Sequence, residues 1–197
     1  MSTSDKSNSR YHGLRLIRGG LQCETRIGSI KIVASPEEIP PFPVDAVAAE
    51  EDTFLVLSAD PVVREVHEHP VRLMTRLIET ESETPGSVLV KGKGPFKFLA
   101  IVHDLNQDPT WREAWIAGAL SEIFREAENR KLQSIALPLI GTKHGKLERQ
   151  RFLTLLKRAV DRSSKKYLRR IWLIVTKGTA PHILGLLESE LLGEKPF

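Results

Sequence analysis

The chain has 197 residues with 41% apolar content, enough to bury one sizeable hydrophobic core, and a formal net charge of +4 at pH 7. Its single cysteine, Cys23, excludes an internal disulfide framework and has no partners for a thiolate metal site. The longest apolar runs, such as 171–175, are far shorter than the roughly 20 residues that a membrane-spanning helix requires. Composition therefore predicts a soluble, cytoplasmic protein with no metal, cofactor or membrane partner.

The amino-terminal residues differ in composition from the rest of the chain. Residues 1–12 are polar and lack the apolar stretch of a secretory signal, so we predict a disordered tail there. Residues 13–197 carry periodic apolar segments throughout and predict a single domain.

The first third of that domain alternates short apolar segments with turns. Residues 26–35 alternate as a strand does, and the prolines of 37–43 require an irregular connection. The apolar runs 44–48 and 54–58 predict buried strands, with a hydrophobic loop as the alternative for the second. Residues 58–79 begin with an Asp-Pro helix start and predict a helix.

The remaining residues continue the alternation of strands and helices. Apolar runs predict strands over 86–90, 96–105, 134–140 and 169–175. Helices are predicted from a Thr110–Glu113 capping box onward, over 148–163 and over 180–192. This order predicts the α/β class, as a three-layer α/β/α sandwich with a mixed, mostly parallel central sheet. Ligands of such sheets bind outside the carboxyl ends of the strands.

Two phrases and the order of the elements resemble the macro domain, a fold known for binding ADP-ribose and related nucleotides. The phrase VDAVAAEED, residues 44–52, is similar to the family's VDAIVNAAN. The phrase SIALPLIGTKHGKLE, residues 134–148, is similar to its SIAFPAISTGxxGxP strand and phosphate loop. Between them, residues 86–106 follow the family's pair of strands ending in histidine. The resemblance covers about 28–192 and implies a divergent nucleotide-binding module.

The first phrase departs from the family where the ribose would bind. In the family the second asparagine contacts the distal ribose and is important in members that hydrolyse ADP-ribosyl bonds. Ala49 and Asp52 stand at the two asparagine positions here. Asp52 can accept a hydrogen bond from a ribose hydroxyl, but it cannot donate one as an amide does. We therefore expect Asp52 to be the ribose-side candidate of a weakened site.

Two further family features are altered. The glycine run that brings the backbone close to the pyrophosphate is replaced by TFLVLSAD, residues 53–60, whose side chains would crowd a phosphate. The acidic residue that contacts adenine in the family has Glu37 and Glu38 as its candidates.

The loop after residues 134–140 keeps the chemistry of a phosphate site. Gly141 and Gly145 permit tight or left-handed backbone, and successive amides at such a turn can hold an anion. Thr142, Lys143 and His144 add a hydroxyl and cationic donors. The alternative is a plain strand-to-helix connection whose glycines only permit the turn.

Other candidate residues favour structural roles. His103 ends an apolar strand next to Asp104, whose side chain should point to the opposite face, so His103 is expected to be structural. His67 and His69 are too close along a helix to share a metal. Trp111 and Trp115 are explained by packing of the first helical turn.

Three functions remain open. The first is a non-catalytic module that binds ADP-ribose, a related nucleotide or a phosphate through residues 141–145. The second is an ADP-ribosyl hydrolase using Asp52 or His144, which the missing amide and glycines disfavour. The third is a scaffold that binds nucleic acid or protein through a basic surface, although such a run also suits a solvated helix end. The cations of that surface are Arg162, Lys165, Lys166, Arg169 and Arg170.

Overall fold

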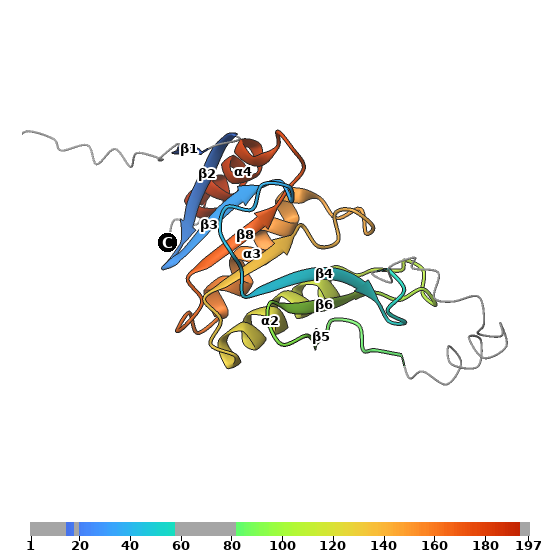
Figure 1. Cartoon of the computed structure of the whole chain (residues 1–197). Helices are drawn as coiled ribbons and strands as arrows, with labels where there is room; N and C mark the ends of the chain where they lie inside the picture. The colour runs from blue at the N-terminus through green and yellow to red at the C-terminus, as the bar shows by residue number, and fades with distance from the viewer. Residues whose placement is uncertain (1–14, 18–19, 58–81, 194–197) are drawn as a thin grey trace, which may run out of the picture.

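The computed structural model describes residues 15–17, 20–57 and 82–193, which form one eight-stranded sheet and three helices (Figure 1). The sheet has the strand order β1-β2-β3-β8-β7-β4-β6-β5. Its strands are β1 Arg15–Ile17, β2 Gly20–Ile27, β3 Ile30–Ser35, β4 Ala46–Asp52, β5 Val88–Lys91, β6 Phe96–His103, β7 Ser134–Pro138 and β8 Arg170–Ile174. The helices are α2 Glu113–Asn129, α3 Arg149–Arg162 and α4 Ala180–Gly193.

The central strands run parallel and the edges run antiparallel. The pairs β3–β8, β8–β7, β7–β4 and β4–β6 are parallel, whereas β1–β2, β2–β3 and β5–β6 are antiparallel. This arrangement confirms the predicted α/β class with a mixed, mostly parallel sheet. It also brings the carboxyl ends of β4, β6 and β7 to one edge.

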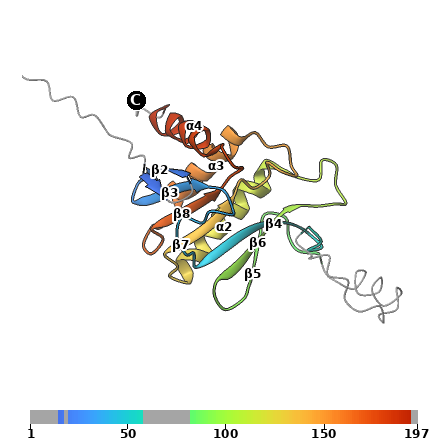
Figure 2. The ribbon, with the colours of Figure 1, turned by 45° about the horizontal axis from the view of Figure 1, so that its top comes forward.

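The three described helices cover one face of the sheet (Figure 2). The apolar stripe predicted for α2 is fully buried at Ile116, Leu120 and Ile123. It packs in one cluster with the inward side chains of the strands and of the other two helices. No described helix is both long and apolar enough to cross a lipid bilayer.

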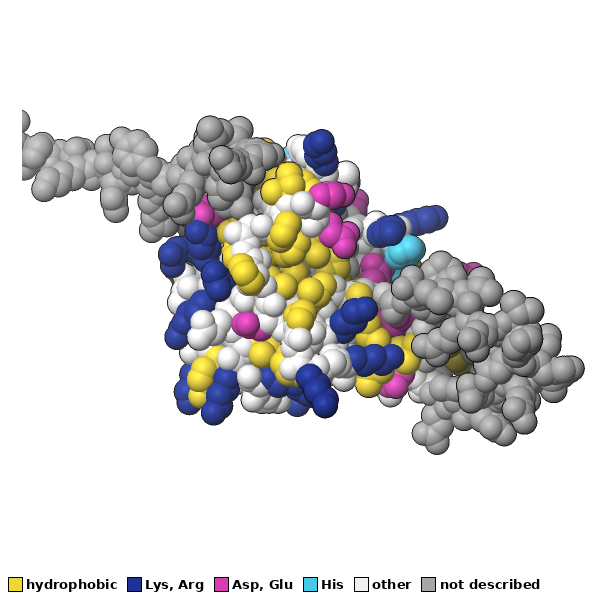
Figure 3. Space-filling model, in the orientation of Figure 1, with side chains coloured by type: hydrophobic (Ala, Val, Ile, Leu, Met, Phe, Trp, Pro, Cys, Tyr) yellow, Lys and Arg dark blue, Asp and Glu magenta, His cyan; other side chains and the backbone are white. Residues whose placement is uncertain are grey.

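The connection 36–45 crosses the opposite face of the sheet from β3 to β4 (Figure 1). The Arg170 guanidinium lies 4.7 Å from the centre of the Phe42 ring, which joins this connection to β8. Space filling shows apolar side chains in the middle of this face, with Lys and Arg around its margin (Figure 3).

Two carboxylates fix the amino ends of the central strands. Asp45 Oδ2 accepts hydrogen bonds from the N–H groups of Gln133 and Ser134, at 2.8 and 2.9 Å, just before β4 and β7 begin. Glu128, near the end of α2, accepts the N–H of Leu168 at 3.0 Å, shortly before β8. Because a one-residue slip would move every side chain to the other face, these bonds help set the strand register.

Several predicted elements were placed differently. Residues 26–35 form parts of β2 and β3 joined by a turn, in which Gly28 takes a positive φ of 58°. Residues 54–57 form the hydrophobic loop that was the alternative to a strand, because the N–H groups of Phe54, Val56 and Leu57 bond to the preceding Asp52 carboxylate. The capping box is wrong, since α2 has Arg112 as its N-cap without a side-chain bond. The predicted helix 58–79 lies outside the described residues.

Candidate functional site

The loops that follow β4, β6 and β7 meet at the carboxyl edge of the sheet. The chain after β6 turns back so that Trp111 forms a β-bridge with His103. In space filling, basic side chains and a histidine project next to acidic side chains where the loop after β7 lies (Figure 3). This edge therefore holds groups of both charges.

The backbone of the loop after β7 is closed by its own hydrogen bonds. Gly141 has a φ of +81°, and its carbonyl accepts the Leu147 N–H at 2.9 Å. The Thr142 hydroxyl donates to the Leu139 carbonyl at 2.7 Å, so it serves the turn itself. A Cβ on Gly145 would lie 2.7 Å from the Gly141 oxygen and 3.0 Å from the Trp111 ring. Both glycines are therefore required by this turn.

The tip of this loop presents unused donors to solvent. The side chains of Lys143, His144 and Lys146 are exposed. Among the described residues, no acceptor lies within hydrogen-bond range of the backbone N–H groups of 143–146. Lys146 was not predicted as a site residue, although it directly follows the predicted range. Consecutive free amides beside cations suit an anion.

Behind this loop lies a buried carboxylate–imidazole pair. His103 Nε2 lies 2.5 Å from Glu50 Oε1, and the two side chains are 3% and 10% exposed. The ring of His144 meets the ring of His103 edge-on, with 6.2 Å between ring centres. Sequence reasoning missed Glu50, because only the parallel pairing of β4 with β6 brings it to His103.

Asp104 lies apart from this pair, as expected for the next residue along. Its carboxylate accepts the Asn106 N–H at 3.0 Å and the Gln107 side-chain amide at 2.6 Å. Asp104 thus stabilises the turn after β6 and has no contact with the imidazole ring of His103.

The ribose-side candidate, Asp52, is completely buried in the loop after β4. Its Oδ1 accepts the Phe54 N–H at 2.6 Å, and its Oδ2 accepts the N–H groups of Val56 and Leu57, both at 2.9 Å. Leu55 takes a φ of 61° at the middle of this loop. The predicted ribose contact would require the loop to release this carboxylate, and it stays a prediction.

The adenine-side candidates Glu37 and Glu38 are exposed in a turn after β3, closed by the Ile39 N–H on the Pro36 carbonyl at 3.1 Å. Strand β8 separates β3 from β7 in the sheet. Within the described ranges, neither glutamate makes a hydrogen bond or ion pair with the loop after β7. The structure therefore does not bring these two residues to the 141–145 loop.

The basic segment 162–170 uses part of its charge internally. Lys165 Nζ lies 3.2 Å from Asp161, and Lys166 Nζ lies 5.2 Å from the centre of the Tyr167 ring. Arg169 donates to the carbonyls of Lys165 and Lys166. Arg162, Lys166 and Arg169 stay exposed, so binding of a nucleic acid by this segment stays a prediction.

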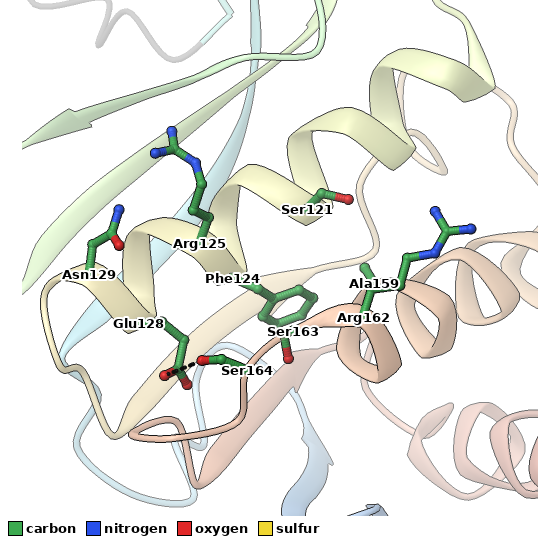
Figure 4. Close-up of a pocket in the computed structure, with 9 residues that line it drawn as sticks. All are labelled: Ser121, Phe124, Arg125, Glu128, Asn129, Ala159, Arg162, Ser163 and Ser164. Carbon is green, nitrogen blue, oxygen red and sulfur yellow. Dashed lines mark hydrogen bonds between the residues drawn. The ribbon is translucent and has the colours of Figure 1, made fainter.

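Two hollows lie away from this edge. One, of about 300 Å³, lies between the carboxyl-terminal ends of α2 and α3, where the Phe124 ring sits between the helices and the guanidinium groups of Arg125 and Arg162 point in different directions (Figure 4). Burial alone would raise the pKa of Glu128 in its wall, but bonds from Leu168 N–H, Ser164 and other donors lower that pKa overall. The other, of about 400 Å³, lies at the amino ends of β4 and β6. Each is too far along the strands to belong to the carboxyl edge.

Across the described ranges, no group of three or more His, Cys, Asp or Glu side chains is arranged to hold a metal ion. The groups at this edge are thus the N–H groups and cations of 143–146, the carboxylates of Glu50 and Asp52 at the end of β4, and the imidazoles of His103 and His144.

No family model matches the chain, and no curated protein matches it in sequence. Solved structures do match. The Oceanobacillus iheyensis macrodomain with ADP has a TM-score of 0.61 at 12% identity, over 87% of this chain and 95% of the other.

Two further structures agree. The macro domain of ganglioside induced differentiation associated protein 2 has a TM-score of 0.55 at 13% identity, over 82% of this chain and 85% of the other. The macrodomain of Thermus aquaticus DarG has a TM-score of 0.53 at 16% identity, over 74% and 98%. Such identities establish shared architecture, and the chain accordingly has the macrodomain fold.

Proposed function

We propose that this chain is a non-catalytic module that binds ADP-ribose, a related nucleotide or another phosphate ligand through residues 141–145. The observation that carries the proposal is the row of unpaired N–H groups at 143–146, flanked by the exposed Lys143, His144 and Lys146. Backbone amides that converge in a turn, aided by cations, are a general solution for binding phosphate. A macrodomain of similar fold was solved with ADP, a ligand that carries phosphate groups. Ligands of largely parallel sheets bind outside the carboxyl ends of the strands, which is where residues 141–145 lie.

Binding is favoured over catalysis by the state of the acidic residues. Asp52 has both oxygens engaged by its own loop, and Glu50 is held by His103. Neither is free to position an attacking water at the described edge, and misplacement of a catalytic group is costly. An ADP-ribosyl hydrolase would need a different base.

Calorimetry with AMP, inorganic phosphate and ADP-ribose tests the binding. We expect heat of binding for at least one of the three with the wild-type chain, and at least a roughly tenfold loss for Gly145→Glu, whose side chain cannot fit beside Trp111. Gly185→Glu is the matched control, because Gly185 is exposed in α4 with open space around it. No heat with any ligand at millimolar concentration would reject the proposal.

The non-catalytic part has its own test. Incubation of the chain with an ADP-ribosylated protein should leave the modification intact. Release of ADP-ribose that is lost in a folded His144→Ala variant would instead favour the hydrolase.

A further inference from the structure

The loop after β4 is an anion-binding turn that already contains an anion. Three N–H groups, of Phe54, Val56 and Leu57, point at one carboxylate, that of Asp52, at distances of 2.6 to 2.9 Å. Turns in which successive amides converge in this way bind phosphate or carboxylate groups in many proteins. Here the bound group belongs to the chain itself, so no external anion can use these donors while Asp52 stays in place.

Acidic side chains gather around that carboxylate at the end of β4. Glu50, Glu51 and Asp52 are consecutive at the end of β4. Asp52 is fully buried, where charges are weakly screened. Glu50 faces His103, which in turn meets the exposed His144 of the phosphate loop. The acidic strand end therefore lies directly behind the basic loop, one imidazole pair away.

We propose, on the basis of the proposed function above, that the site selects ligands with one phosphate group over ligands with two. The single phosphate binds the free N–H groups and cations of 143–146. The part of the ligand that extends toward β4 meets the carboxylate of Glu50 and a turn whose N–H groups are already bonded to Asp52. That part of the ligand is therefore neutral or cationic. The ligand class is a nucleoside or sugar monophosphate, in preference to a diphosphate such as ADP or ADP-ribose.

The test compares AMP, ADP and ADP-ribose by calorimetry at constant ionic strength without divalent cations. We expect AMP to bind about tenfold more tightly than ADP or ADP-ribose, and inorganic phosphate to compete with it. Asp52→Asn removes the charge and one oxygen acceptor, which leaves N–H groups open for a second phosphate. In that variant the preference for AMP over ADP should fall to about threefold or less.

Asp104→Asn is the matched control. Asp104 directly follows the strand β6 and also accepts a loop N–H, but it lies outside the turn after β4. The ratio of the affinity for AMP to the affinity for ADP should not change in the Asp104→Asn variant. If Asp52→Asn does not fold, Glu50→Gln replaces it, because the amide oxygen keeps the contact with His103 while the charge is lost. This variant should also lower the ratio, by about threefold.

The outcomes separate the two proposals. Failure of AMP, phosphate and ADP-ribose alike to bind removes the proposed function and this inference with it. Binding of ADP or ADP-ribose as tight as that of AMP, lost in Gly145→Glu, keeps the proposed function and overturns only the preference for one phosphate. An unchanged ratio in a folded Asp52→Asn or Glu50→Gln variant overturns it as well.

Discussion

The loops after β4 and β7 follow neighbouring parallel strands, yet they treat their backbone N–H groups in opposite ways. After β4, the Asp52 carboxylate accepts three of them within the chain. After β7, the N–H groups of 143–146 have no acceptor among the described residues, and cations surround them. The two loops thus lie at the same edge of the sheet, but the Asp52 side chain occupies the N–H donors of one loop, while those of the other loop remain available.

The largest expected effect comes from emptying the loop after β4. Asp52→Ala leaves three N–H groups without their charged acceptor, and we expect a loss of about 3 kcal/mol in the free energy of unfolding. Urea denaturation measures it. Added acetate or phosphate should restore part of the loss in a saturable way, by binding the vacated turn. Asp104→Ala should cost under about 1 kcal/mol, and an equal loss there would contradict the comparison.

The next effect comes from crowding the loop after β7. Gly145→Ala places a Cβ 2.7 Å from the Gly141 oxygen and 3.0 Å from the Trp111 ring. We expect about 1–2 kcal/mol of destabilisation and at least a roughly tenfold loss of AMP affinity. Gly185→Ala, in the open part of α4, should instead be neutral or stabilising by up to about 1 kcal/mol. Wild-type affinity in Gly145→Ala would show that the ligand binds elsewhere.

The segment 166–168 is a second place where a carboxylate of the chain accepts several backbone N–H groups. It tests whether such an arrangement raises the free energy of unfolding in general. Glu128 accepts N–H groups of 166–168, and its pKa lies below its ordinary value. Its contribution is therefore complete above the unfolded-state pKa of about 4.3 and is lost as pH falls through the lower folded-state pKa. Glu128→Gln should cost about 1 kcal/mol at pH 7, since the group is only partly buried. The difference from wild type should shrink below pH 4, and a constant difference down to pH 2 would refute the assignment.

The smallest effects concern single cations of the open loop. Lys143→Ala and Lys146→Ala should each weaken AMP binding by a few fold, with the loss greatest at low salt and unfolding free energy unchanged. Lys177→Ala, an exposed lysine after β8, is the control. Equal affinities for all three variants at low salt would leave the N–H groups as the main source of binding.

The sequence predicted the features that depend on local pattern. The apolar run of β7 and the glycines of 141–145 lie next to one another in the chain, so the strand and its turn could be located. The buried stripe of α2 followed from helical spacing in the same way. The order of these elements, together with the resemblance to the macro domain, was enough for the fold.

The features that depend on distant pairing could not be located. Glu50 and His103 meet across 53 positions, through the register of β4 with β6. The apolar residues 54–57 are compatible with a strand or a loop. Hydrophobicity alone does not reveal that the Asp52 carboxylate accepts hydrogen bonds from three of their N–H groups and so closes a loop. Thr110 has the right spacing for a cap, but α2 begins at Glu113 with Arg112 as its N-cap, so Thr110 lies before the capping position.

The carboxylates of Asp45 and Glu128 act at the amino ends of the strands, away from every residue proposed to bind ligand. Strand register is therefore anchored at one end of the sheet, and the proposed ligand site lies at the other. The register bonds of Asp45 and Glu128 are therefore expected to persist when side chains of the loops after β4 and β7 are substituted, even where such a substitution lowers the free energy of unfolding.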